Sequence, residues 1–94
     1  MPLTFEWDLR KARLNPTKHG VAFEEASTVF GDPLSLTIPD PEHSQRENRY
    51  ITMGKTFNGK LLVVVHTDRD DNIRIISARR VSRRERKVYE EIIE

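Results

Sequence analysis

Two apolar runs dominate the second half of the chain, at 61–65 and at 73–78, and the polar segment DRDDN lies between them. The first run, LLVVV, is apolar at every position, so we expect a strand over 61–67 that is buried on both faces and central in a sheet. The second run predicts a neighbouring strand over 73–80. Because Asp and Asn are common turn residues, the polar segment predicts a hairpin between the two strands.

A third strand is expected over 49–57, because the pair Asn58-Gly59 follows it directly. Asn-Gly between two strand patterns favours a two-residue type I′ turn, in which both central residues have positive φ. Such a turn would pair Ile51 with His66 and place both side chains on one face of the sheet.

Alternation along 73–80 would put Ile75 and Arg79 on one face of the sheet and Ala78 and Arg80 on the other. Both faces would then become cationic at the same end of this strand. We therefore expect the arginines to gather at the rim of the sheet, where the strand ends and a closing helix begins.

The closing helix is expected over 83–93, because Ser82 and Glu85 match a capping box. Near the amino terminus, Asp8 is a suitable N-cap for a helix that starts at 9, and Pro16 predicts that this helix kinks or ends near Leu14. The other expected elements are a strand over 3–7, a helix over 22–30, a strand over 34–38, and an apolar stripe on the closing helix made of Val88, Tyr89, Ile92 and Ile93.

The element order β-α-α-β-β-β-β-α predicts an α+β fold in one domain over 1–94, with a small antiparallel sheet, two N-terminal helices and a C-terminal helix packed on it. The chain has 94 residues and no cysteine, which excludes disulfides and thiolate metal sites. With no signal peptide and no apolar run long enough to span a membrane, we expect a cytoplasmic protein.

The net charge of +1 hides an uneven distribution of charge along the chain. The segment 72–87 contains seven basic residues and one acid, whereas most acids lie elsewhere. Such segregation produces a local positive field, which suits an anionic partner such as RNA.

Four blocks carry a resemblance to a known family: FEWD at 5–8, KHGVAFEEA at 18–26, VVVHT at 63–67 and IRIISARRVSRRE at 73–85. Together they resemble the BrnT-type toxins, a branch of the RelE-like ribonucleases of bacterial type II toxin–antitoxin systems. The resemblance implies a RelE-like toxin that cleaves mRNA, on the ribosome or free of it, without a metal or other cofactor. It also implies a cognate BrnA-like antitoxin that binds the toxin in a hetero-oligomer. The antitoxin, through its own DNA-binding domain, would bind the operator DNA and repress their operon.

Metal-free RNA cleavage requires a base for the 2′-OH, cations for the phosphorane and an acid for the leaving oxygen. His66 titrates near neutrality, but a histidine at the core margin is an equally simple interpretation. Glu85 is either a base or a residue that completes the capping box and pairs with an arginine, and Lys18 and His19 either contact phosphate or complement a helix C-terminus. The candidate catalytic residues are His66, Arg79, Arg80, Glu85 and Lys18, and the candidate RNA-binding residues are Arg74, Arg83, Arg84 and His19.

We expect no metal site, because the histidines lack ligand spacing and the carboxylates are not expected to cluster with them. Two functions remain open at this stage. The chain is either an endoribonuclease toxin or a degenerate toxin that binds nucleic acid or an antitoxin and cleaves nothing.

Overall fold

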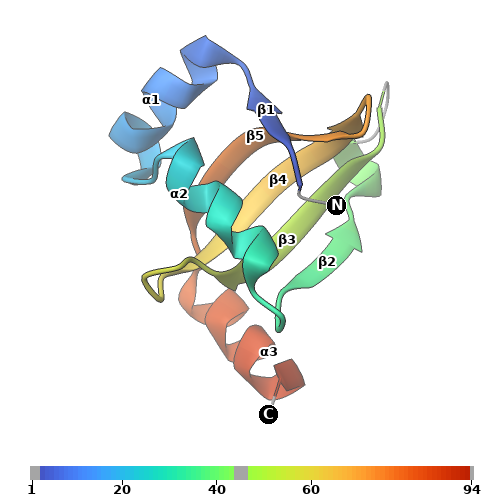
Figure 1. Ribbon diagram of the computed structural model, residues 1–94. Helices are drawn as coiled ribbons and strands as arrows, with labels where there is room; N and C mark the ends of the chain where they lie inside the picture. The colour runs from blue at the N-terminus through green and yellow to red at the C-terminus, as the bar shows by residue number, and fades with distance from the viewer. Residues whose placement is uncertain (1–2, 44–46, 94) are drawn as a thin grey trace.

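The structure of the protein is a computed structural model that describes residues 3–43 and 47–93. Its centre is a five-stranded sheet in the order β1-β5-β4-β3-β2 (Figure 1). The strands are β1 (Phe5–Trp7), β2 (Leu36–Pro39), β3 (Arg49–Lys55), β4 (Leu61–Arg69) and β5 (Asn72–Arg80). The helices are α1 (Leu9–His19), α2 (Phe23–Ser27) and α3 (Arg83–Ile93), with 3-10 turns η1 (Thr28–Gly31) and η2 (Pro41–His43).

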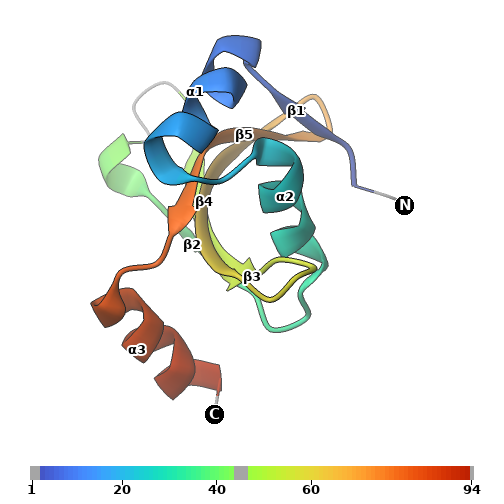
Figure 2. The same ribbon diagram turned by 90° about the vertical axis from the view of Figure 1, so that its left-hand side faces the viewer.

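The predicted α+β class and the antiparallel meander of β3, β4 and β5 are confirmed. The sheet as a whole is mixed rather than antiparallel, because β1 pairs with β5 in parallel and covers the outer edge of the meander. Figure 2 shows α2 against one face of the sheet and α3 on the other side, beyond the end of β5. Within the described residues, no helix is both long enough and apolar enough to cross a membrane.

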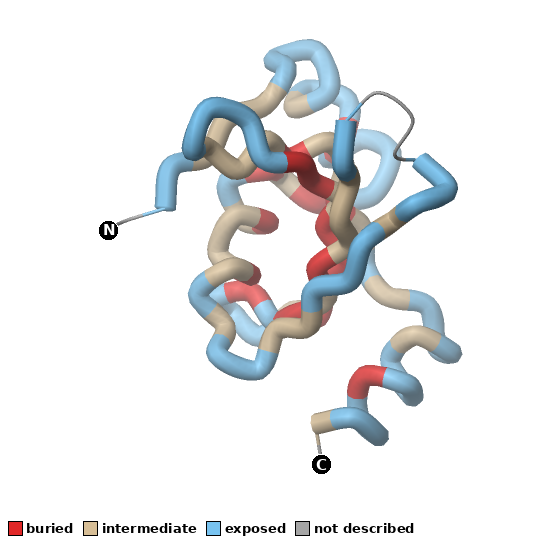
Figure 3. The backbone as a smooth tube through the Cα atoms, turned by 90° about the vertical axis from the view of Figure 1, so that its right-hand side faces the viewer, coloured by how far each residue is buried: buried red, intermediate tan, exposed pale blue. Residues whose placement is uncertain are grey.

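The hydrophobic core lies between the sheet and the segment that contains α2 and η1 (Figure 3). Partly buried aromatic side chains from β1 and η1 pack against the margin of this core, namely Phe5, Trp7 and Phe30. Burial of each large side chain contributes roughly 1.5–3 kcal/mol to folding, so this core layer stabilises the packing of the α2–η1 segment on the sheet. The buried core residues are Val21, Phe23, Ala26, Val29, Leu62, Val64, Ile75 and Ala78.

The turn between β3 and β4 has three residues rather than two, and it shifts the register of these strands by one residue. The backbone N–H of Thr56 donates to the carbonyl of Lys60, and Gly59 closes the loop with a φ of 84°. This geometry matches a type I turn followed by a left-handed glycine. The predicted pairing of Ile51 with His66 is therefore wrong, and the two side chains lie on opposite faces. The observed pairs include Tyr50–His66, Ile51–Val65 and Met53–Val63.

The β4–β5 hairpin has the two-residue turn that was expected in the β3–β4 hairpin. Asp70 and Asp71, between β4 and β5, have φ values of 50° and 67°, as a type I′ turn requires. The tight turn sets Arg69 opposite Asn72 and begins the longest ladder of the sheet.

A β-bulge interrupts β5 and reverses the predicted faces of part of the strand. Val65 pairs with Ser77 and His66 pairs with Ile75, so Ile76 is an extra residue without a partner on β4. As a result Ile75 and Ala78 both lie in the core. The predicted placement of Arg79 on the face of Ile75 is wrong, because the bulge turns Arg79 to the face opposite the core.

Helix α1 continues through Pro16, so the predicted end near Leu14 is wrong. The buried side chain of Asn15 holds the last turn: its Nδ2 donates to the carbonyls of Val21 and Ala78, both at 2.8 Å. Its Oδ1 accepts the N–H of Ala78 at 3.3 Å. At about 1 kcal/mol for each bond, these contacts offset the cost of about 3 kcal/mol for an interior proline.

Two other predicted helices differ from expectation in detail. The helix expected over 22–30 is split into α2 and the 3-10 turn η1. On α3 the predicted span is confirmed, but its apolar stripe is only half buried. Tyr89 is 1% exposed, whereas Val88 and Ile92 are 47% and 60% exposed.

Candidate nucleic-acid interface

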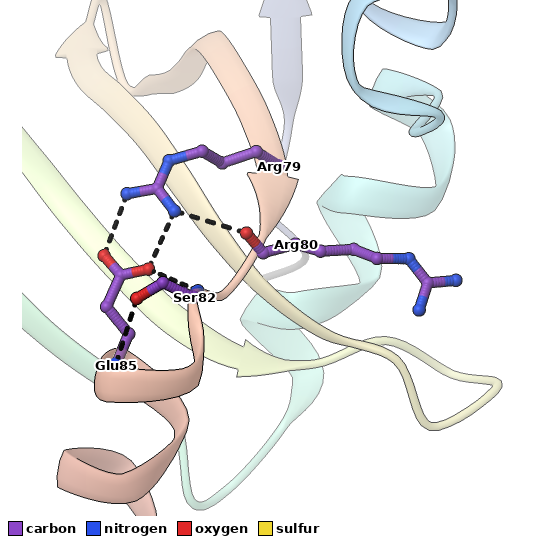
Figure 4. Close-up of polar contacts among 4 residues, drawn as sticks. All are labelled: Arg79, Arg80, Ser82 and Glu85. Atoms are coloured by element: carbon purple, nitrogen blue, oxygen red, sulfur yellow. Dashed lines mark hydrogen bonds and ion pairs between the residues drawn. The ribbon is translucent and has the colours of Figure 1, made fainter.

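Arg79, Ser82 and Glu85 form a fixed cluster where β5 ends and α3 begins (Figure 4). Nη1 and Nη2 of Arg79 each donate to one oxygen of Glu85 at 2.8 Å, and Nη1 also donates to the carbonyl of Arg80 at 3.2 Å. Ser82 N donates to Glu85 Oε1 at 2.7 Å, and Glu85 N donates to Ser82 Oγ at 3.1 Å. The predicted capping box is confirmed, and Arg79 is bound to it.

This cluster also determines the charge of Glu85. The hydrogen bonds from Arg79, together with the N–H of Ser82, lower the pKa of Glu85 to about 2. A carboxylate with so low a pKa accepts protons poorly near neutrality. The geometry therefore favours a role in which Glu85 orients the Arg79 guanidinium, and a catalytic role for Glu85 stays a prediction.

Arg80 points away from this cluster. Figure 4 shows its side chain extending towards the α2 side of the sheet, while Arg79 extends to the other side. The two neighbours leave β5 on opposite faces because side chains alternate along a strand. The predicted placement of Arg79 and Arg80 on opposite faces is confirmed, so the two guanidinium groups do not converge, and of the two only Arg79 joins the strand-to-helix cluster.

The face of the sheet opposite the core contains a groove of about 320 Å³, which we call the sheet groove. Its apolar lining comes from three adjacent strands, and its polar lining includes two arginines and one histidine. Arg79 therefore lies beside a surface that a base or ribose could contact while a guanidinium meets the phosphate. The lining residues are Asp40, His43, Arg49, Ile51, Val63, Val65, Ile76, Ser77 and Arg79.

A second pocket places Lys18 and His19 near the same strand. It is lined by the end of α1 and by Ile76 and Ser77, which also line the sheet groove. The sheet groove and this second pocket therefore adjoin at the β-bulge of Ile76. Two candidates separated from Arg79 by some sixty positions in the chain are brought to the same part of β5.

His66 lies inside the protein rather than on an open end of its strand. It is 5% exposed, and its Nε2 shares a hydrogen bond of 2.7 Å with Thr52 Oγ1. The ring of Phe30 meets it edge-on at 4.8 Å, and Tyr50 stacks on it at 5.9 Å. Burial lowers the pKa of His66, so the ring is neutral near pH 7. These contacts favour a core histidine over an accessible base, but the ring is only half satisfied, because its Nδ1 is buried without a hydrogen-bond partner among the described residues.

The other candidate cations have separate positions. Arg74 donates to Glu6 at 2.7 Å and thereby links β5 to β1. Arg83 and Arg84 are exposed in the first turn of α3. Cations at a helix N-terminus oppose the helix dipole by roughly 0.3–1 kcal/mol each, so an anion bound nearby would remove this cost.

His43 was not among the candidates that the sequence suggested. Its Nδ1 lies 2.9 Å from Oδ2 of Asp40, three positions earlier, in the turn η2. The expectation that no carboxylates gather near a histidine is wrong, because polar atoms of Asp40, Glu42 and His43 lie within 4.8 Å of one another. Exposed acidic turns commonly have this arrangement without an ion. The spacing of an acid and a histidine in DPEH was the available local signal.

A sheet face that combines an apolar lining with arginine and histidine side chains, and that continues to further cations on α1, suits contact with the phosphates and sugars of a nucleic acid. The chain belongs to the family of BrnT ribonuclease toxins of type II toxin–antitoxin systems, since the family model matches residues 7–85. Membership of such a system implies an antitoxin partner.

The fold is similar to the crystal structure of the Brucella abortus ribonuclease toxin BrnT, determined at 1.1 Å resolution. The TM-score is 0.63 at 19% sequence identity, over 87% of this chain and 100% of that chain. This likeness shows the fold, whereas the relation to RelE stays a prediction. No curated protein matches the sequence at a significant level.

Proposed function

We propose that this chain is an endoribonuclease toxin that cleaves mRNA by attack of a ribose 2′-OH on the adjacent phosphate, without a metal ion. The observation that supports the proposal most directly is the Arg79 guanidinium, held by Glu85 at the sheet groove in a chain of a ribonuclease family. Metal-free cleavage requires such a fixed cation, because negative charge grows on the phosphorane in the transition state.

The contacts of Arg79 leave it able to bind phosphate. A guanidinium has five N–H donors, and the hydrogen bonds to Glu85 and Arg80 use three of them. The side chain of Arg79 is 43% exposed, so a phosphate can approach it from solvent. Glu85 therefore acts as a support that fixes the direction of the fork before RNA arrives.

Further cations extend this surface. Lys18 and His19 lie across the bulge at Ile76, and Arg83 and Arg84 follow Arg79 on the first turn of α3. In the proposal these four side chains contact the RNA backbone on either side of the cleaved linkage. Arg74 and Arg80 make a smaller contribution, since Arg74 is paired with Glu6 and Arg80 faces the other side of the sheet.

Cleavage of a labelled RNA by the purified chain in the presence of EDTA tests this function. We expect products with 2′,3′-cyclic phosphate and 5′-OH ends, and we expect Arg79→Ala to lower the rate by about 100-fold, as for loss of one oxyanion-type donor. Glu91→Gln on α3 serves as a matched surface control. Intact RNA with the wild-type chain, or an undiminished rate with Arg79→Ala, would contradict the proposal.

We also propose that a BrnA-like antitoxin binds the chain in a hetero-oligomer and represses their operon through its own DNA-binding domain. Co-expression tests this: the pair should elute together on size exclusion, and the antitoxin should abolish RNA cleavage. Operator binding by the toxin alone would count against the proposal.

The alternative is a degenerate toxin that binds RNA or an antitoxin without cleavage. A specific observation favours it: His66 is buried, and Glu85 is held in an ion pair with Arg79, so neither of these two candidate proton carriers is a free base. RNA binding without cleavage, and without growth arrest on expression, would establish this alternative.

A further inference from the structure

The proposed reaction requires a group that accepts the proton of the 2′-OH, and this group must reach the RNA. His66 is 5% exposed, and its Nε2 is already bonded to Thr52. Glu85 carries two hydrogen bonds from Arg79. The sheet groove nevertheless contains one histidine of a different kind, His43, whose side chain is 62% exposed.

The turn η2 holds His43 and Asp40 in a defined geometry. The N–H of Asp40 donates to the carbonyl of Arg49 on β3 at 2.8 Å, which anchors the turn to the sheet. The N–H of His43 donates to the carbonyl of Asp40 at 3.3 Å, and the two side chains meet at 2.9 Å. The carboxylate is well covered, since the Asp40 side chain is only 13% exposed.

This pairing selects one form of the ring. An ionised carboxylate only accepts hydrogen bonds, so Nδ1 of the neutral imidazole carries the proton and Nε2 is the acceptor. A largely covered carboxylate that orients an exposed imidazole is an arrangement by which enzymes prepare a histidine base. His19 has no such partner among the side chains that the structure describes.

We propose that His43 is the general base of the cleavage reaction and that Asp40 is its positioning residue. This inference rests on the proposed ribonuclease function and deepens it. His43 Nε2 takes the proton of the 2′-OH, the 2′-oxygen forms a bond to phosphorus, and the bond between phosphorus and the 5′-oxygen breaks. The leaving 5′-oxygen takes a proton from solvent water, so the products are a 2′,3′-cyclic phosphate and a 5′-OH.

The position of the pair agrees with this role. Both His43 and Asp40 line the sheet groove together with Arg79, so a phosphate held by Arg79 lies in the same hollow as the base. Ile51 and Val65 form part of the apolar surface of that hollow. A nucleotide seated there would present its ribose to one side of the groove and its phosphate to the other.

The test measures single-turnover cleavage of an oligoribonucleotide, and binding of its 2′-deoxy analogue, for the full chain and its variants. We expect His43→Ala to lower the cleavage rate by about 100-fold or more and to leave binding of the analogue nearly unchanged. Added imidazole should restore part of the rate of His43→Ala and should not affect Arg79→Ala. Asp40→Asn should lower the rate by a smaller factor, because the ring loses its fixed orientation.

Glu42→Gln is the matched control, since Glu42 belongs to the same turn and, within the described part of the chain, forms no hydrogen bond with His43. We expect the cleavage rate of this variant to stay near that of the wild type. Two results would overturn the role of His43 and leave the ribonuclease function standing. One is a His43→Ala variant that cleaves RNA at the wild-type rate. The other is a His43→Ala variant with an unchanged melting curve whose lost activity imidazole does not restore. A requirement for a divalent cation together with a large loss in Glu42→Gln also overturns the role of His43. A wild-type chain that leaves RNA intact overturns the ribonuclease function and this inference together.

Discussion

At the scale of single residues, two histidines, His66 and His43, differ in exposure and in bonding partner. His66 and His43 are both candidates for proton transfer by residue type alone. His66 lies against Phe30 and Thr52 in the interior, where burial lowers its pKa, whereas His43 is exposed and paired with a carboxylate. Accessibility and the identity of the partner decide which of them can meet a substrate.

The Arg79–Glu85 pair predicts an acid-dependent loss of stability. The pKa of Glu85 is lowered from 4.5 to about 2 in the folded protein, so its contribution is complete above pH 4.5 and is lost as the pH falls towards 2. Because Arg79 is 43% exposed, solvent screening reduces the contribution to about 1 kcal/mol.

Urea unfolding at pH 7 and pH 3 tests this prediction. Glu85→Gln should lower the free energy of unfolding at pH 7 and should flatten its decline between the two pH values. Glu90→Gln on the same helix serves as the control and should keep the wild-type slope. An unchanged decline in Glu85→Gln would show that other groups cause the acid sensitivity.

At the scale of elements, the first turn of α3 contains cations that are unfavourable at the positive end of the helix dipole. This turn contains Arg83, Arg84 and Arg86, and Glu85 is the only acid there. Only Tyr89 is fully buried on this helix, so α3 is held by few apolar contacts. An element that begins with unfavourable charge and packs lightly is consistent with a surface retained for binding rather than for stability.

Arg84→Glu should therefore separate stability from RNA binding. We expect this variant to gain about 0.5 kcal/mol in the free energy of unfolding, because an acid replaces a base at the helix N-terminus. Its affinity for RNA should fall. Lys87→Glu makes the same change of charge beyond the first turn and should stabilise the chain less. A destabilised Arg84→Glu variant would contradict the dipole argument.

At the scale of the whole molecule, the two sides of the sheet have different tasks. The side that faces α2 and η1 contains the core, and the opposite side contains the sheet groove, Arg79 and the Asp40–His43 pair. The bulge at Ile76 joins this groove to the pocket beside α1. Cations from distant parts of the chain thus lie along one continuous surface.

Binding of a non-cleavable RNA should accordingly depend on salt. For single strands the slope of log K against log salt is about −0.7 for each phosphate neutralised, so Arg79→Ala should make the slope shallower by about 0.7. Arg69→Ala, at the other end of the β4–β5 hairpin, is the matched control and should leave the slope unchanged. Equal changes in both variants would indicate a non-specific effect of net charge.

Much of the fold was predictable from local patterns. The continuous apolar run of β4 identified the central strand, and Ser82 with Glu85 identified the start of α3, because strand burial and helix capping depend on neighbours in the sequence. The end of α1 was mispredicted, since the bonds that hold Asn15 come from Val21 and from distant Ala78. The sequence predicted that Glu85 pairs with an arginine, and the structure identifies that arginine as Arg79. His43 was not a candidate, although the spacing of Asp40 and His43 was a local signal of their contact.

The sequence by itself determined which segments form strands and helices, where the cations are concentrated, and the family to which the chain belongs. Tertiary structure alone decided which cations share a surface. A three-residue loop at Gly59 and one extra residue at Ile76 shifted the alternation of side chains, and each shift exchanged the two faces of a strand. These choices depend on how strands pair across the sheet, and a periodic pattern along one strand contains no information about its partner's register.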